Sequence, residues 1–231
     1  MQRLSKVLAA AGVASRRACE KLIFSSAIKV NGEVVTIPYM LVDPTRDSIC
    51  LNDYPIRHSE AKVYYMVNKP RGYICSNSRI GSKKLVIDLF GGERRRLFTV
   101  GRLDQDTTGL LLVTNDGHFS QKVIHPSNNL TKEYLVKVKQ EITHQHLYIL
   151  AQGVFIERKK IKPISVKKIR RGTMKVRVRE GKNREVRRMI QDAGLDLLSL
   201  VRIRIGALHL GFLREGEWRE LNAKERVLIF S

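Results

Sequence analysis

The sequence predicts an α+β protein of two domains, and three observations predict it. Apolar residues over 4–11 follow the period of an amphipathic helix, and the pair Asn31-Gly32 between apolar runs is typical of a β-hairpin. From about Ala61 the pattern changes to apolar runs of strand length separated by helical segments. A chain of 231 residues is long enough for one small and one medium domain. We therefore expect a small α/β domain at residues 1–58 and a larger α+β domain at 61–231.

The N-terminal region predicts two helices joined by a tight turn. The first helix uses the face that runs from Leu4 to Ala11, and Gly12 stops it. Ser15 is a candidate N-cap for a second helix that continues through Ile23. A helix–turn–helix of this kind is compatible with either DNA or RNA.

The charge of the chain predicts a polyanionic partner. Lys and Arg number 43 against 22 Asp and Glu, which gives a formal net charge of +21. DNA, RNA and an anionic membrane all fit the charge alone. The longest apolar runs are far short of a membrane span, and the first residues lack the apolar core of a signal peptide. We therefore expect a cytoplasmic protein with a nucleic-acid partner and no membrane. Candidate contacts in the first domain are Arg3, Lys6, Arg16 and Arg17.

Residues 101–109 form a polar stretch with one arginine and two aspartates. The apolar run 110–113 follows directly and ends at the turn signal Asn115-Asp116-Gly117, as expected of a buried strand. Charged groups beside a buried strand are unfavourable unless they are paired or used, and loops on rigid strands commonly carry chemistry. An isolated Asp-x-Asp, taken alone, favours a turn whose side chains bond the nearby backbone.

Residues 101–111, Gly-Arg-Leu-Asp-x-Asp-Thr-x-Gly-Leu-Leu, resemble the central motif of the pseudouridine synthases, in the branch that modifies ribosomal RNA. The resemblance implies a catalytic domain with a mixed, mainly antiparallel sheet flanked by helices. It also implies that Asp104 is the catalytic carboxylate. Arg102 would enter the gap left when the target uridine leaves its stack; the alternative for Arg102 is a backbone phosphate contact.

Two further segments resemble motifs of the same family. Lys132-Glu133-Tyr134 begins a predicted strand, and the family has a Lys-x-Tyr segment whose tyrosine lies against the target base. Tyr134 is thus a candidate to stack on an extruded uracil, with core packing as the default role of a strand tyrosine. Near Val186, the resemblance implies that the basic residue after the valine, Arg187, pairs with Asp104.

The region that carries Arg187 is strongly basic. Residues 157–188 hold 15 basic and 3 acidic side chains, and one face of the strand predicted around Val176 and Val178 is almost all positive. We expect this region to contact RNA, with a solvated surface as the alternative. The helix after it has a candidate N-cap at Asn183 and an apolar face that includes Met189. Two arginines of this helix point further outward than Arg187 and are candidate RNA contacts: Arg184 and Arg188.

The strand predicted over residues 63–67 is broken by Asn68-Lys69-Pro70-Arg71-Gly72, which resembles a family segment that shapes the active-site cleft. For Lys69 the sequence leaves a structural role and an RNA contact open. The N-terminal region has Arg3-Leu4, Leu8 and Gly12-Val13-Ala14-Ser15-Arg16-Arg17, followed by Lys29-Val30-Asn31-Gly32. This combination resembles the S4 RNA-binding domain, over about residues 1–58. One departure is Ser26-Ala27-Ile28, where that family usually has Gly-Arg before the first strand, so one phosphate contact is expected to be missing.

Cofactor chemistry has no support in the sequence. Three cysteines, Cys19, Cys50 and Cys75, form no Cys-x-x-Cys pair, the six histidines show no metal-ligand spacing, and no phosphate-binding glycine loop is present. We therefore expect no metal and no cofactor. Isomerisation of uridine needs neither; it needs an ionised carboxylate, which would attack the ribose C1′ or abstract a ribose proton. Asp106 is the rival carboxylate and is expected to organise the loop.

The sequence therefore predicts a ribosomal RNA pseudouridine synthase with an S4 domain. The motifs around Arg187, Arg202 and Trp218 look closest to the large-subunit synthase B branch, which implies large-subunit (23S) RNA as substrate. The alternatives are a small-subunit (16S) synthase, a non-catalytic RNA-binding or ribosome-assembly protein, and a DNA-binding regulator. We expect a monomer that acts on ribosomal RNA or on an assembling subunit.

Overall fold

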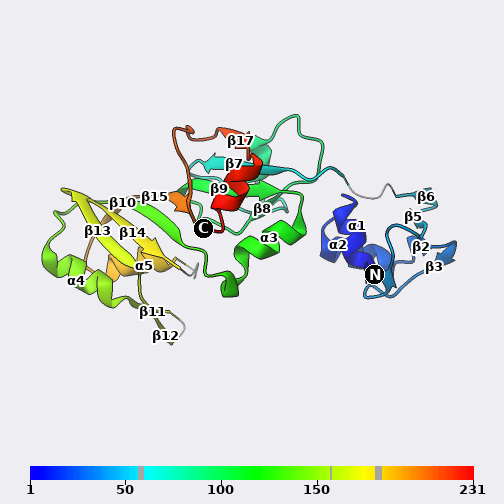
Figure 1. Ribbon diagram of the computed structural model, residues 1–231, viewed down its shortest axis with the longest axis horizontal. Coiled ribbons are helices and arrows are strands. Elements are labelled where there is room, and N and C mark those ends of the chain that lie inside the picture. The colour runs from blue at the N-terminus through cyan, green and yellow to red at the C-terminus, as the bar shows by residue number, and fades with distance from the viewer. Residues whose placement is uncertain (57–59, 157, 180–183) are drawn as a thin grey trace. The chain divides into compact units, whose positions relative to one another are not determined.

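The computed structural model describes residues 1–56, 60–156, 158–179 and 184–231, and the chain folds into two compact units (Figure 1). The first unit comprises Met1–Val63 together with Gly92–Leu97 and Asn115–Gly117. The remaining segments, Tyr64–Gly91, Phe98–Thr114 and His118–Ser231, make up the second unit. The domain end expected at His58 lies outside the described residues.

The first unit contains the two expected helices and small antiparallel sheets. The N-cap expected at Ser15 is confirmed, because its side chain accepts a hydrogen bond from the backbone N–H of Ala18 at 3.2 Å. Asn31 and Gly32 both have positive φ, 53° and 88°, and join two paired strands, as the hairpin signal predicts. The elements of this unit are α1 (Leu4–Ala10), α2 (Arg16–Phe24), β1 (Gln2–Arg3), β2 (Ile28–Val30), β3 (Glu33–Val34), β4 (Leu41–Val42), β5 (Ile49–Leu51) and β6 (Tyr54–Pro55).

Apolar faces of the two helices pack on strands of the sheet, whose order is β3-β2-β5-β6. Leu4 and Leu8 of α1 and Ile23 of α2 are all fully buried. Ser26, two residues after the end of α2, has φ of 61°, a backbone conformation that favours glycine. Serine therefore stands here in a left-handed conformation that a glycine would adopt at less cost.

The second unit is built on a nine-stranded sheet with the order β13-β14-β10-β15-β9-β7-β17; β16 pairs with β15, and β8 with β9. Among the described strands, β15 and β9 pair in parallel and the other pairs are antiparallel, so the expected mixed, mainly antiparallel sheet is confirmed. Its strands are β7 (Tyr64–Lys69), β8 (Phe98–Val100), β9 (Thr108–Thr114), β10 (Lys132–Val138), β13 (Ser165–Arg170), β14 (Thr173–Val178), β15 (Leu197–Ile205), β16 (Leu208–His209) and β17 (Trp218–Glu220). A separate hairpin pairs β11 (Val154–Ile156) with β12 (Lys159–Ile161). The helices are η1 (Val86–Leu89), α3 (Gly117–Ile124), η2 (Pro126–Asn128), α4 (His144–Gln152), α5 (Glu185–Asp192) and α6 (Ala223–Leu228).

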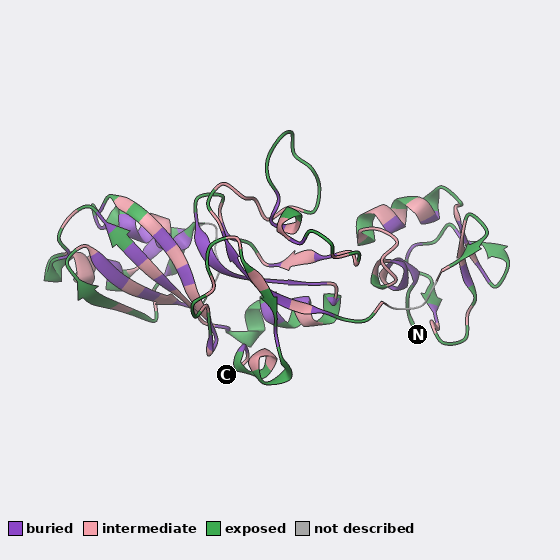
Figure 2. Cartoon of the chain, turned by 90° about the horizontal axis from the view of Figure 1, so that it is seen from above, coloured by how far each residue is buried: buried purple, intermediate pink, exposed green. Residues whose placement is uncertain are grey.

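Strand β9 is buried along its whole length, as the continuous apolar run predicts (Figure 2). Leu110 and Leu112 lie in a core cluster with Val123 of α3 and Ile229, which follows α6. The strand is thus a rigid support for the polar loop that precedes it.

Strands β9 and β15 approach each other so closely at one position of β9 that only glycine fits there. Gly109 is the register partner of Arg202 on β15, and its φ is 105°. A Cβ at Gly109 would lie 2.3 Å from the carbonyl oxygen of Arg202. The parallel pairing in the middle of the sheet therefore requires a residue without a side chain here.

Two boundaries differ from the sequence prediction. Strand β7 continues through Asn68 and Lys69, because these residues pair with Leu110 and Gly109 of β9. The residue before α5 is Arg184, with φ of 54°, so the N-cap predicted at Asn183, which lies outside the described residues, is one position too early. The rest of the helix is as predicted, with Met189 buried on its apolar face.

Candidate active site

The loop between β8 and β9 carries Asp104, and hydrogen bonds of its backbone N–H groups hold it on both sides of this residue. The N–H of Thr107 donates to the carbonyl of Asp104 at 3.1 Å, which closes a turn around the two aspartates. Leu103, just before it, is buried, and its N–H lies 3.4 Å from the sulfur of Cys75. The loop thus begins and ends in fixed positions, and Asp104 projects between them.

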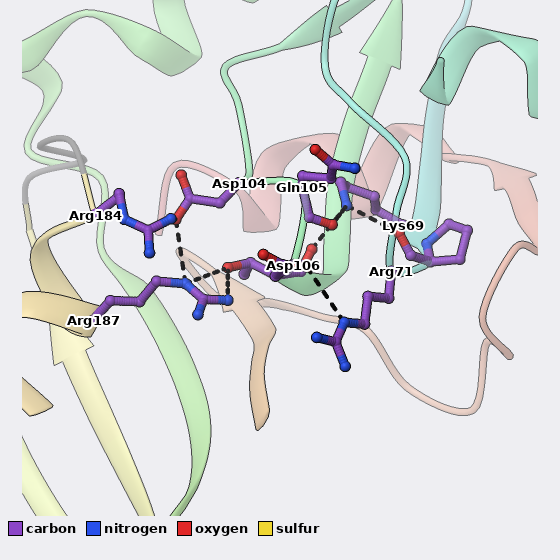
Figure 3. Close-up of polar contacts among 9 residues, drawn as sticks. Lys69, Arg71, Asp104, Gln105, Asp106, Arg184 and Arg187 are labelled. Atoms are coloured by element: carbon purple, nitrogen blue, oxygen red, sulfur yellow. Dashed lines mark hydrogen bonds and ion pairs between the residues drawn. The ribbon is translucent and has the colours of Figure 1, made fainter. Parts of the chain in front are cut away.

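Asp104 faces two arginines from the region of α5 (Figure 3). Its Oδ2 lies 3.4 Å from Nε of Arg187 and 3.6 Å from Nη1 of Arg184. The side chain of Arg187 is 17% exposed and that of Arg184 is 49% exposed, so Arg187 is the better shielded partner. The pairing of Asp104 with Arg187 agrees with the geometry expected from the sequence, whereas the contribution of Arg184 to the same carboxylate was not predicted.

Thr107 orients Arg187 toward the loop. Its hydroxyl oxygen accepts hydrogen bonds from Nη2 and Nε of Arg187 at 3.0 and 3.3 Å. Burial is the largest influence on the pKa of Arg187 and lowers it, and Arg184 acts in the same direction, while Asp104 raises it. The arginine remains a cation at neutral pH and is held by a neutral group as well as by the carboxylate.

Lys69 supports the same loop, and the structure favours one of the two roles that the sequence left open for it, an RNA contact or a structural role. The side chain is fully buried, and its amine donates to the carbonyl oxygens of Pro70, Gln105 and Thr107 at 2.9, 3.2 and 2.9 Å. Burial lowers the pKa of Lys69. An amine whose three donors are all used inside the protein has none left for a phosphate, so the structural role is the one that fits.

The rival carboxylate, Asp106, lies on the outer side of the loop. Its Oδ1 is 3.4 Å from Nε of Arg71, and both side chains are more than half exposed. The two aspartates of the loop therefore have different neighbours, since Asp104 faces α5 and Asp106 faces the turn after β7 (Figure 3).

A pocket opens beside Asp104, and Tyr134 lies in its wall. Tyr134 is 9% exposed, and burial raises the pKa of its hydroxyl, whereas nearby Arg202 acts to lower it. The other described residues that line the pocket are Arg102, Leu103, Thr107, Lys132, Arg184, Glu185, Val186, Arg187, Leu200 and Arg202. The structure therefore brings together all three residues for which the sequence predicted a catalytic role.

Arg202 is the residue of this pocket that sequence reasoning missed. It is 5% exposed, and its Nε donates to the carbonyl oxygen of Leu110 at 2.7 Å. In the sequence it stands in an alternating run of basic and apolar residues, which is typical of a solvated strand face. No local signal distinguishes it from Arg204 two positions later.

The other predicted RNA contacts differ in position. Arg102 and Arg184 are exposed at the pocket, while Arg188 is half-buried on α5 and is not among the described pocket residues. On β14 the basic face is partly neutralised, since Lys175 lies 3.5 Å from Glu133. In the first unit, Arg3 and Arg16 line a pocket together with the exposed Phe24 and Tyr39. Arg17 is exposed, and Lys6 is half-buried.

Two further properties concern the described residues as a set. They contain no cluster of three or more His, Cys, Asp or Glu side chains that could hold a metal ion. None of the helices within the described ranges is long and apolar enough to cross a membrane.

Comparison with known proteins identifies both parts of the chain. Residues 63–192 match the family model for RNA pseudouridylate synthase, and residues 2–47 match the S4 domain. A Bacillus subtilis protein named ribosomal large subunit pseudouridine synthase B is 39% identical over 97% of this chain and 94% of its own length. An Arabidopsis thaliana protein, named as a putative chloroplastic ribosomal large subunit pseudouridine synthase, is 46% identical over 90% of this chain, which spans 55% of that protein.

A solved structure agrees with the sequence relatives. A crystal structure of a pseudouridylate synthase superimposes with a TM-score of 0.72 at 30% identity and covers 99% of this chain and all of its own. The fold, the pocket and these matches define a two-part RNA-modifying protein. The chain belongs to the RNA pseudouridine synthase family and carries an S4 domain.

Proposed function

We propose that this protein converts a specific uridine of large-subunit ribosomal RNA into pseudouridine, with Asp104 as the catalytic carboxylate. The observation that carries the proposal is the pocket in which Asp104, Arg187 and Tyr134 lie together. The carboxylate is 31% exposed, so it is accessible to a ribose, and the guanidinium of Arg187 lies beside it at 3.4 Å.

The reaction is an isomerisation of a single uridine, and it needs a carboxylate in a cleft that admits this nucleotide. The N1–C1′ bond of the uridine breaks, the uracil turns, and C5 bonds to C1′; the C5 proton leaves and N1 gains a proton. Asp104 either attacks C1′ or abstracts a ribose proton. Tyr134 stacks on the extruded uracil, and Arg187 orients Asp104. Arg102, exposed at the pocket mouth, occupies the space that the base leaves.

RNA binding and catalysis are assigned to different parts of the chain. Residues 1–58 bind RNA through exposed basic groups such as Arg3, Arg16 and Arg17, and residues 61–231 perform the chemistry. The Bacillus relative, matched over 94% of its length, is named a large-subunit enzyme, which supports the large subunit over the small subunit as target. The protein would act as a monomer in the cytoplasm, on ribosomal RNA or on an assembling subunit.

A pseudouridine map of ribosomal RNA from cells with and without the gene tests this proposal. One site lost from the large-subunit RNA is the expected result, and a plasmid that carries the wild-type gene should restore it. A site lost from the small-subunit RNA would keep the chemistry and overturn the target. If no site is lost, the proposal is wrong, and a non-catalytic RNA-binding role takes its place.

A further inference from the structure

The guanidinium of Arg202 is buried in the pocket wall with one of its donors unused. Nε bonds to the carbonyl oxygen of Leu110 at 2.7 Å, but Nη2 is shielded from solvent and has no hydrogen-bond partner among the described residues. Burial of a cationic donor without an acceptor is unfavourable, and such groups in folded proteins call for an explanation. A ligand with an oxygen acceptor would satisfy Nη2.

The position of Arg202 in the sheet indicates that the oxygen acceptor belongs to the target base. Arg202 is the register partner of Tyr134 on β10, and both line the pocket that holds Asp104. Within the proposed active site, Tyr134 contacts the face of the extruded base, so the neighbouring Nη2 is placed to meet an edge of the same ring. Uracil presents two carbonyl oxygens, O2 and O4, on its edges.

Other cations of the pocket already have protein partners. The amine of Lys132 donates to the carbonyl oxygen of Arg179 at 3.3 Å, and the guanidinium groups of Arg184 and Arg187 lie against Asp104. A phosphate would be met first by an exposed arginine such as Arg102, because Arg202 is 5% exposed. A ring carbonyl that enters with the base fits a buried donor better than a backbone phosphate does.

We propose that Nη2 of Arg202 donates a hydrogen bond to a carbonyl oxygen of the target uracil and so fixes the base in the pocket. The inference rests on the proposed active site, because it requires the uracil to bind beside Asp104 and Tyr134. Arg202 is thereby a substrate-binding residue. Its bond to Leu110 and its position opposite Gly109 hold the guanidinium rigidly, which suits a group that must orient a ring.

Single-turnover rates on three RNA fragments test the contact. The fragments carry the mapped target position as uridine, 2-thiouridine or 4-thiouridine, in which sulfur replaces O2 or O4 and accepts a hydrogen bond weakly. Wild-type protein should be slowed about tenfold or more by one of the two thio substitutions, since a bond from a charged donor contributes that much. If neither substitution slows the wild type, the proposal is overturned without any variant.

Arg202→Lys identifies the donor, and Arg204→Lys is the matched control on the same strand, outside the described pocket residues. Arg202→Lys should be slower on uridine by about tenfold or more and should lose the wild-type sensitivity to the thio substitution. Arg204→Lys should keep that sensitivity. Because each protein is compared with itself on three RNAs, partial unfolding lowers all three rates equally and leaves their ratio intact.

The same series separates this inference from the proposed function. An Arg202→Lys protein with the wild-type thio sensitivity overturns the role of Arg202 while leaving Asp104 in place. Turnover retained by Asp104→Asn overturns the proposed catalytic site, whatever the thio series shows. Wild-type sensitivity that disappears in Arg202→Lys, together with an inactive Asp104→Asn, supports both.

Discussion

Nε of Arg187 lies 3.4 Å from Oδ2 of Asp104, a separation typical of an ion pair and longer than a close charge-assisted hydrogen bond. The guanidinium is held instead by the hydroxyl of Thr107, which accepts bonds from both Nε and Nη2. The arginine is therefore oriented independently of the carboxylate. Asp104 keeps its oxygens accessible to a ribose while it stays beside a fixed positive charge.

Asp104→Asn removes the reactive carboxylate at almost constant shape. We expect product formation to fall on the order of 10⁴-fold, the scale seen when one member of a catalytic group is removed. RNA affinity at fixed salt should change less than about threefold, because Asp104 makes no favourable contact with a polyanion. Rates from single-turnover assays and affinities from fluorescence anisotropy check both parts. A variant that still turned over would move the chemistry to another residue.

Arg187→Ala and Arg184→Ala test whether the buried arginine matters more than the exposed one. Loss of Arg187 leaves Asp104 misplaced and without its shielded partner, so we expect kcat to fall about 100-fold. Loss of Arg184, half exposed, removes a screened pair and should cost less than about fivefold. Single-turnover rates on the same RNA give the comparison. Equal losses in the two variants would contradict the larger role assigned to the shielded arginine, Arg187.

Arg102→Ala tests the role of the arginine at the pocket mouth. If Arg102 fills the space left by the extruded uridine, its loss should slow extrusion about tenfold or more. The reason is that no side chain then replaces the stacking contacts that the uridine gives up. A fluorescent base analogue beside the target uridine reports extrusion directly. Unchanged fluorescence kinetics together with weaker, more salt-sensitive binding would assign Arg102 to a backbone phosphate instead.

Local patterns were sufficient to predict the elements that frame the site. Helix periodicity and the Ser15 cap locate α2, and a continuous apolar run locates β9, because these signals depend on residues close together in the chain. The resemblance to a family motif placed Asp104 and Arg187 in one site, where the structure also has them.

Contacts distant in the chain could not be predicted in the same way. Arg202 and Leu110 are 92 positions apart, and the alternating pattern around Arg202 is that of a solvated strand. The parallel pairing of β15 with β9 buries it, and strand pairing of this kind leaves no local signal. Lys69 was left open for a related reason, since its three acceptors come from two separate segments of the chain.

Lys69→Met tests the buried support of the catalytic loop. The change leaves three carbonyl groups without their donor, so we expect the free energy of unfolding to fall by about 3 kcal/mol. Lys137→Met, at an exposed position of β10, should change it by less than about 0.5 kcal/mol. Urea denaturation at pH 7 measures both, and activity should fall with Lys69→Met because Gln105 and Thr107 shift.

The difference in unfolding free energy between wild type and Lys69→Met should increase with pH. Burial lowers the pKa of Lys69 in the folded state below its ordinary value of 10.5, so the unfolded chain binds more protons between these two values. The stability that Lys69 contributes therefore rises with pH through that window and is lost as the pH falls through the folded-state pKa. The difference in unfolding free energy between wild type and Lys69→Met should grow toward pH 10. A constant difference would contradict the lowered pKa.

Gly109→Ala tests the close approach of β9 and β15. Its methyl group would lie 2.3 Å from the carbonyl oxygen of Arg202, and the φ of 105° is strained for any residue with a side chain. Because backbone atoms cannot yield without separating the two strands, we expect a loss of about 4 kcal/mol or more in the free energy of unfolding. Gly216→Ala is the matched control, with a similar φ of 87° and no heavy atom within 4 Å of the added carbon. Gly216→Ala should lower the free energy of unfolding by about 1–2 kcal/mol. This loss measures the backbone strain alone, so the difference between the two variants measures the steric clash at Gly109. Equal losses would mean that the two strands can separate at Gly109 at little cost, and that the position of Arg202 does not depend on this glycine.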